Sequence, residues 1–281
     1  MVKLAENRYG KSRVRLVRVK RRDGWHELQE WTVQVLLQGD FASCFTDGDN
    51  SKILPTDTMK NTVYSLARNS PATGIEDFAK ELSGFLLGRN PQVAAAEVTI
   101  SETPWDHVVT QGNAHPATFV QSTRELRTAT VVLERSGASS VVSGVDNLVI
   151  LKTAGSAFTG YVKDSLTTLP ETRDRLFGTA VRASWTYASP NASFDTLRIT
   201  VRNLLLSAFA EHQSESVQHT LYAMAQNVLD HVPEVRDVQL TMPNKHCLLV
   251  DLARFGQDNP NEIFVPADEP HGFIEARVTR E

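Results

Sequence analysis

The sequence predicts an α+β protein built from two tandem repeats, each with the element order β-β-α-α-β-β. Alternating apolar and polar residues mark the strands, apolar residues at helical spacing mark paired helices, and the second half of the chain repeats the order of the first. Helix pairs of this kind pack on one face of an antiparallel sheet. We therefore expect one repeat over residues 1–122 and the other over residues 123–281.

The first repeat is expected to start with a long β-hairpin. Residues 13–22 and 26–38 alternate on either side of Asp23-Gly24, which is a turn signal. The remaining elements of this repeat are helices over 56–68 and 75–88, followed by strands over 93–101 and 119–122.

The second repeat shows the same patterns over a longer stretch. A hairpin around Ser136-Gly137 opens it, and two helices with one apolar stripe each follow later. The expected strands cover 124–134, 140–151, 179–187, 235–242 and 246–252, with an edge pair at 263–266 and 273–278, and the expected helices cover 167–177, 194–212 and 216–232.

The stretch from Leu54 to Tyr64 has the composition of a helix start. Pro55 holds Leu54 extended, and we expect Thr56 or Asp57 to cap the helix by accepting hydrogen bonds from free amides of its first turn. One interpretation is an ordinary capped helix. The other is an anion-binding helix start, because free N–H groups and the positive end of the helix dipole attract negative charge.

Both predicted sheets have long edge strands that the chain itself does not obviously cover. Such edges must be paired, covered or charged. Pairing with further copies of the chain into a closed barrel would satisfy them, so we expect a homo-oligomer.

The composition is that of a globular protein, with 41% hydrophobic and 22% charged residues and a net charge of −4. This charge gives no support for nucleic-acid binding. The sequence shows no secretory signal, no apolar run that could span a membrane and no Ser-Lys-Leu peroxisomal signal. We expect a cytoplasmic protein with no membrane partner.

Cofactor motifs are missing from the sequence. The two cysteines, Cys44 and Cys247, are too few to stabilise a chain of this length by disulfides, and the eight histidines show no metal-ligand spacing. Neither a Gly-x-Gly-x-x-Gly motif, a Walker loop nor a Gly-x-Ser-x-Gly elbow is present. We expect no metal and no organic cofactor, although a metal site assembled from distant parts of the chain stays open.

Polar residues at the ends of predicted elements are the candidates for chemistry. They are Lys11, Thr56, Asp57, Arg175, Gln218, Asn244 and His246. Each also has a structural interpretation, which is favoured when the residue is taken singly. Arg175 can pair with Glu171 one helical turn earlier, and Asn244 can hold a turn beside a proline. Lys11 can be a solvated strand-start charge, and Gln218 an exposed first-turn residue.

Three separated stretches resemble the urate oxidase (uricase) family. They are Arg8-Tyr-Gly-Lys-Ser-Arg-Val-Arg15, Thr56-Asp-x-x-Lys-Asn-Thr-Val-Tyr64 and Met242-Pro-Asn-Lys-His246. Further family-like stretches are Phe158-Thr-Gly-Tyr161, Thr167-Thr-Leu-x-Glu-Thr-x-Asp-Arg175, Ser216-Val-Gln218 and Phe255-Gly-Gln-Asp-Asn-Pro-Asn261. The resemblance implies the tunnelling fold, in which sheets surround a central tunnel. It also implies oxidation of urate by O₂ to 5-hydroxyisourate and H₂O₂ without a cofactor.

The resemblance implies a proton relay and a clamp for the substrate. Lys11, Thr56 and His246 would form the relay. Arg175 would hold one edge of urate, because a planar guanidinium suits a planar anion, and the Gln218 amide would hold the opposite edge.

The resemblance also implies further contacts to urate and O₂. Phe158 would stack on the purine ring, and Asn244 would hold O₂ or the attacking water above it. The other implied substrate contacts are Thr56, Asp57, Leu169 and Val217. Thr159 departs from relatives that carry a larger side chain there, which could alter the packing around Phe158.

The family further implies a homotetramer whose active sites lie at subunit interfaces. Two alternatives stay open. The first is another tunnelling-fold enzyme acting on a pterin or purine, and such enzymes often use a His/Cys metal cluster. The second is a non-catalytic purine-binding oligomer, which would bind urate without consuming O₂.

Overall fold

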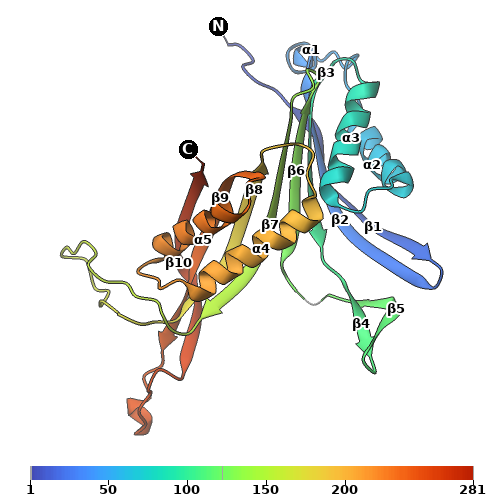
Figure 1. The fold of residues 1–281 in the computed structure, drawn as a ribbon. Helices are drawn as coiled ribbons and strands as arrows, with labels where there is room; N and C mark the ends of the chain where they lie inside the picture. The colour runs from blue at the N-terminus through green and yellow to red at the C-terminus, as the bar shows by residue number, and fades with distance from the viewer. Residues whose placement is uncertain (1, 122, 281) are drawn as a thin grey trace. The chain divides into compact units, whose positions relative to one another are not determined.

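The computed structural model of this protein describes residues 2–121 and 123–280. It separates into two compact units. The first contains the chain up to Gly144 together with Thr186–Thr196, and the second contains Val145–Trp185 and the chain from Leu197 onward. Each unit combines an antiparallel sheet with helices, as the α+β prediction requires (Figure 1).

The first unit contains the predicted hairpin and helix pair. Its elements are β1 (Tyr9–Arg22), β2 (Trp25–Gly39), α1 (Ala42–Thr46), α2 (Thr56–Asn69), α3 (Ile75–Arg89), β3 (Val93–Thr103), β4 (Asp106–Thr110), β5 (Asn113–Val120) and β6 (Leu126–Glu134). The main sheet has the strand order β1-β2-β3-β6, with every pair antiparallel. α3 packs on β3 and β6, and α2 packs on β1.

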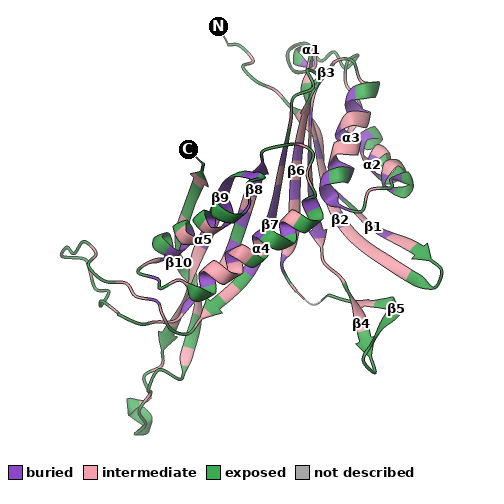
Figure 2. Ribbon diagram, in the orientation of Figure 1, coloured by how far each residue is buried: buried purple, intermediate pink, exposed green. Residues whose placement is uncertain are grey.

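The core of the first unit lies between this sheet and its helices. From Trp31 to Leu37 every second residue of β2 is buried, and the side chains of Trp31, Val33, Val35 and Leu37 are 0% exposed. Trp31 stacks on Phe78 of α3, with 4.9 Å between the ring centroids. Figure 2 shows the buried residues on the strands that α3 covers. Because side chains alternate across a strand, the pattern that predicts β2 also selects its buried face.

The second unit contains the second helix pair. Its elements are β7 (Ser139–Lys152), which begins in the first unit, β8 (Phe177–Tyr187), α4 (Phe194–Glu211), α5 (Val217–His231), β9 (Val235–Leu249), the 3₁₀ turn η1 (Ala253–Phe255) and β10 (Phe264–Thr279). The strands have the order β7-β8-β9-β10, and α5 packs on β9 and β10. Phe177 and Phe209 meet in the core with 5.1 Å between their ring centroids.

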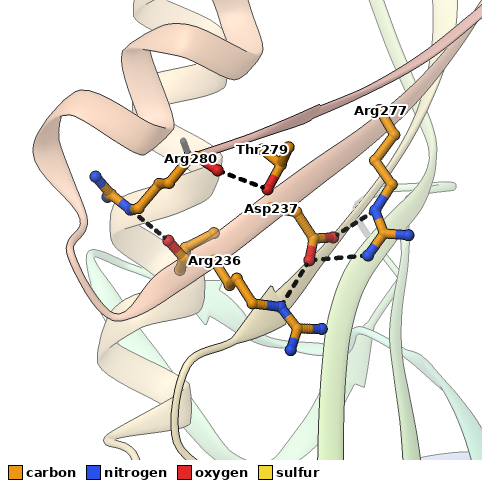
Figure 3. Close-up of polar contacts among 6 residues, drawn as sticks. Arg236, Asp237, Arg277, Thr279 and Arg280 are labelled. Carbon is orange, nitrogen blue, oxygen red and sulfur yellow. Dashed lines mark hydrogen bonds and ion pairs between the residues drawn. The ribbon is translucent and has the colours of Figure 1, made fainter.

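A buried carboxylate joins the last two strands of the second unit. Asp237 on β9 is 4% exposed and accepts a hydrogen bond from Nε of Arg277 on β10 at 3.0 Å (Figure 3). Nη2 of Arg277 lies 3.0 Å from the other carboxylate oxygen, and Nε of Arg236 donates at 3.2 Å. The hydrogen bond to Asp237 raises the pKa of Arg277. A buried carboxylate needs such partners, because an unpaired charge is costly to desolvate.

Residues 167–177 are not helical, so the prediction of a short helix is wrong. Residues before Phe177 form a loop in which Thr172 pairs with the backbone of Phe158, and Phe177 itself begins β8. Pro170 gives a physical reason, because a proline disfavours helical dihedral angles at the residue before it, here Leu169 in the first turn of the predicted helix.

The predicted side-chain cap of α2 is also wrong. The helix starts at Thr56, its N-cap is Pro55, and no side chain caps it. A capping residue must be extended, and Pro55 with a ψ of 137° already occupies that position. Asp57 instead pairs with Lys60 and accepts a hydrogen bond from Nδ2 of Asn61 at 3.0 Å.

The last two strands are longer than predicted. The four segments expected at 235–242, 246–252, 263–266 and 273–278 fall on two strands, β9 and β10. The two C-terminal segments therefore pair with β9 and not with each other. Pro243 lacks an N–H group and lies opposite Phe273, yet the ladder continues to Asn244, which lies opposite Gly272.

One short hairpin was not expected. β4 pairs with β5 in a separate two-stranded sheet, and the strand predicted at 119–122 is the end of β5 up to Val120. Ser122 lies outside the described residues. Gln111 and Gly112 have φ values of 53° and 80°, which are the left-handed conformations of a tight hairpin turn.

The predicted repeat boundary at residues 122 and 123 stays a prediction. In the part of the chain that the structure describes, no helix is long and apolar enough to cross a membrane.

Candidate active site

The first unit holds Lys11, Thr56 and Asp57 around the start of α2. The hydroxyl of Tyr9 accepts a hydrogen bond from the Leu54 amide at 2.8 Å and donates to the Leu54 carbonyl at 3.2 Å. This double contact fixes the chain two residues before Thr56. Lys11 follows Tyr9 on β1 and lies opposite Val35 of β2.

The backbone around Lys11 is closely constrained. A Cβ atom on Gly10 would lie 1.8 Å from the carbonyl oxygen of Val35, so only glycine fits at this crossing of the two strands. The register of β1 then shifts between Lys11 and Val14, where Arg13 has a φ of 58°. This bulge ends the regular ladder directly after Lys11.

The positive charge of Lys11 contributes to the lowered pKa of Asp57. Lys60 lowers the pKa of Asp57 through a hydrogen bond and its charge, and Asn61 and Lys11 lower it further. Lys11 therefore lies within electrostatic range of Asp57, in the first turn of α2, which Thr56 begins.

In the second unit, three chain segments lie side by side and carry Phe158, Arg175 and Gln218. The Phe158 amide donates to the Thr172 carbonyl at 2.8 Å, and the Thr172 amide donates back at 3.1 Å. The Ala157 amide donates to the Ser214 carbonyl at 2.7 Å. Residues far apart in the sequence therefore meet through backbone hydrogen bonds.

Arg175 faces the ring of Phe158. Its guanidinium carbon lies 5.3 Å from the ring centroid, a cation–π distance. Burial lowers the pKa of Arg175, and its Nε is buried with no hydrogen-bond partner among the described residues. A buried donor of this kind is costly unless a partner satisfies it, so it is suited to binding an acceptor. Tyr161 stacks on Phe158 with 4.8 Å between centroids.

A cavity of about 510 Å³ lies beside Arg175. Leu169, Asn244 and His246 line it together with Arg175, so four of the predicted site residues meet here. The ion pair considered between Arg175 and Glu171 is wrong, because Glu171 pairs with Lys163 at 2.8 Å. The turn considered at Asn244 is also wrong, because this residue lies within β9.

Val217 and Gln218 open α5. Ser216 is the N-cap, and its hydroxyl oxygen accepts a hydrogen bond from the His219 amide at 3.1 Å. Val217 is 4% exposed and anchors the helix start, whereas the Gln218 side chain is exposed. Gln218 is therefore an exposed first-turn residue, and its role in the clamp stays a prediction.

The sequence patterns did not single out two residues that hold the site. Tyr9 fixes the approach to Thr56, and the carboxylate of Asp174 accepts the Gly155 amide at 2.8 Å, in the loop leading to Phe158. Both lie inside family-like stretches, which is the one signal that could have found them. Among the described residues, no group of three or more His, Cys, Asp or Glu side chains could hold a metal ion.

The sequence model of the family described as Uricase matches residues 7–132 and 141–275. The uricase of Arthrobacter globiformis is 43% identical over 281 residues, which covers 100% of this chain and 91% of that protein. The uricase of Dictyostelium discoideum is 38% identical, with coverage of 100% and 98%.

Solved structures give the same result. The crystal structure of the uricase from Arthrobacter globiformis has a TM-score of 0.95 at 41% identity, and covers 100% of this chain and 96% of that chain. The urate oxidase from Bacillus sp. TB-90, at 24% identity and a TM-score of 0.85, shares the fold, with coverage of 98% and 100%. These neighbours confirm the predicted α+β tunnelling-fold class. The chain therefore belongs to the uricase family, the urate oxidases among the oxidoreductases.

Proposed function

We propose that this protein oxidises urate with O₂ and water to 5-hydroxyisourate and H₂O₂, without a metal or an organic cofactor. The observation that carries the proposal is the placement of Arg175 against Phe158 at the edge of a cavity. An aromatic ring offers a flat apolar face, and a guanidinium fork offers donors in one plane. Urate is a flat anion with acceptors along its edges, so it suits both groups.

The remaining residues have roles in proton transfer and positioning. Lys11, Thr56 and His246 form the proton relay, Gln218 and Val217 hold the edge of urate opposite Arg175, and Asn244 holds O₂ or the attacking water. Asp57 and Leu169 contact the substrate. Removing a proton from urate makes it a better electron donor to O₂, so a base relay and a water-poor pocket supply what the reaction needs.

The active site is shared between subunits of a homotetramer in this proposal. Thr56 comes from one chain, and Arg175 and Gln218 come from its neighbour. Lys11 and Thr56 belong to the first compact unit and Arg175 and Gln218 to the second, so each chain supplies both kinds of group. The cytoplasmic location stays a prediction.

The test is urate oxidation by protein treated with a chelator to remove metals. We expect urate absorbance to fall with matched, equimolar consumption of O₂. Restoration of a lost activity by one specific metal would instead favour a metal-dependent relative. Urate binding without O₂ uptake would favour a purine-binding protein, and turnover of a pterin in place of urate would favour another tunnelling-fold enzyme.

A further inference from the structure

We propose that Asp174 is a positioning residue that fixes Phe158 and Arg175 relative to each other. The inference rests on the proposed function, in which these two side chains hold urate. Asp174 directly precedes Arg175 in the chain. Its carboxylate contacts the loop that leads to Phe158, so one residue connects both parts of the substrate clamp.

The carboxylate binds two consecutive amides. Oδ1 of Asp174 accepts the Gly155 amide at 2.8 Å and the Ser156 amide at 3.4 Å. Gly155 has a φ of 72°, the left-handed conformation in which successive N–H groups can converge on one anion. Ser156 is 1% exposed, so its amide has little access to water if the carboxylate is removed.

The backbone carries this constraint from Ser156 to the ring of Phe158. Two residues later, Phe158 exchanges two hydrogen bonds with Thr172, at 2.8 and 3.1 Å. The Thr172 hydroxyl donates to the Asp174 carbonyl at 2.9 Å. The loop is thus attached to the Arg175 segment at two points. One is the backbone pair of Phe158 and Thr172, and the other, before Phe158 in the chain, is the contact of the Asp174 carboxylate with Gly155 and Ser156.

The Asp174 carboxylate holds the loop as a hydrogen-bond acceptor rather than as a partner in an ion pair. Asp174 is exposed, and no cation pairs with its carboxylate within 4.0 Å among the described residues. The amine of Lys152 donates to the His212 carbonyl at 2.6 Å. An asparagine oxygen can accept the same two amides, so Asp174→Asn should preserve the geometry and Asp174→Ala should not.

The first measurement is urate binding without O₂, which prevents turnover, together with KM and kcat in air. We expect Asp174→Ala to raise Kd and KM about tenfold, because two amides lose their acceptor, with kcat changed much less. Asp174→Asn should stay within about threefold of wild type. Asp164→Ala is the matched control, because Asp164 also accepts a loop amide, that of Leu166 at 2.8 Å, and should leave urate binding unchanged.

The second measurement is amide hydrogen exchange over residues 155–158, which needs no urate. Exchange should be faster in Asp174→Ala than in wild type and Asp174→Asn. Unchanged exchange and unchanged Kd in a folded Asp174→Ala protein would overturn the inference. If wild type itself fails to bind urate, the proposed function fails, and hydrogen exchange alone then decides whether Asp174 holds the loop.

Discussion

Arg135 and Arg280 hold the ends of two helices through the same three hydrogen bonds. Nε of Arg135 donates to the Val93 carbonyl at 2.7 Å, and Nη2 donates to the carbonyls of Leu87 at 2.9 Å and Asn90 at 2.6 Å. These carbonyls end α3 and begin β3. A guanidinium fork therefore satisfies groups that the helix itself leaves without partners.

Arg280 repeats this arrangement at the end of α5. Its Nε donates to the Val235 carbonyl at 3.0 Å. Its Nη2 donates to the Leu229 carbonyl and, at 2.9 Å, to the Val232 carbonyl. In both units the acceptors lie three residues apart, and Nε binds the first residue of a strand.

Removing either arginine should destabilise the protein. We expect Arg135→Ala and Arg280→Ala each to lower the free energy of unfolding by about 1–2 kcal/mol, because backbone carbonyls lose a charged donor. Arg135→Lys and Arg280→Lys should recover only part of the lost stability, because lysine lacks the planar, forked donors of a guanidinium. Urea denaturation at fixed protein concentration measures the effect.

Arg15→Ala is the control, because the Arg15 side chain is 71% exposed, and it should change stability by less than about 0.5 kcal/mol. Equal losses in all three variants would contradict this explanation.

Arg175→Ala should weaken urate binding about 10- to 100-fold, because the anion loses a charge-assisted forked donor. Arg175→Lys should recover little of the affinity, because a point charge cannot reproduce the planar fork. Anaerobic titration with urate measures both. The exposed neighbour Arg173 serves as the control, and Arg173→Ala should bind as wild type does. Wild-type affinity in Arg175→Ala would place the clamp elsewhere.

Lys11→Met and Thr56→Ala should each lower kcat about 100-fold, and the double variant should be little worse than either single one. The reason is that groups acting as one relay do not contribute additively. Steady-state kinetics of the four proteins measures this. Losses that multiply in the double variant would show that the two residues act separately.

Hybrid oligomers test whether the site is shared between subunits. Chains with Thr56→Ala and chains with Arg175→Ala should each be nearly inactive alone. When they are co-expressed, half of the dimers are mixed and one of their two sites carries both lesions, so about a quarter of all sites should be intact. Activity should recover to about that fraction. Hybrids shown to contain both chains but as inactive as their parents would place the site within one chain.

The stability of the protein should fall below neutral pH partly through His212. Burial lowers the pKa of His212, and the charges of His219 and Lys152 lower it further, while Glu215 opposes them. The unfolded chain therefore takes up this proton more readily, so stability decreases as pH falls below the ordinary value of 6.5 and is unaffected above it.

His212→Gln should flatten this part of the pH dependence. Urea midpoints measured between about pH 5 and 8 give the comparison with wild type. The exposed His115 provides the control, since His115→Gln should keep the wild-type profile. A profile that is the same in all three proteins would show that His212 does not contribute.

Strong periodicity made most of the fold predictable. The hairpin of β1 and β2 and the helices α3 and α5 follow directly from alternation and helical spacing, because burial of one face decides each of them. The pattern of residues 167–177 predicts a short helix, but Pro170 disfavours helical dihedral angles at Leu169, and the structure has a loop there. β4 was missed because a five-residue strand with a Gln-Gly turn gives little signal.

The site itself could not be predicted from local patterns. Nothing in the spacing indicates that Phe158 and Arg175 face each other, because their proximity depends on backbone pairing with Thr172. Resemblance to a family supplied these residues, and their roles stay predictions. Arg135 follows β6 as Arg280 follows β10, and the repeat boundary at residues 122 and 123 stays a prediction.

Because the Tyr9 hydroxyl holds the backbone of Leu54, the position of Thr56 does not depend on the length of the loop before it. Residues 40–53 join β2 to the approach of α2, and Tyr9 of β1 holds both ends of this connection. Its ring packs edge-on against Phe41, with 4.8 Å between the centroids, and its hydroxyl accepts from and donates to the backbone of Leu54. Insertions or deletions between these two points can therefore accumulate without moving the first turn of α2. Natural variation in chain length at this place is then compatible with a constant distance between the strand that carries Lys11 and the helix that carries Thr56.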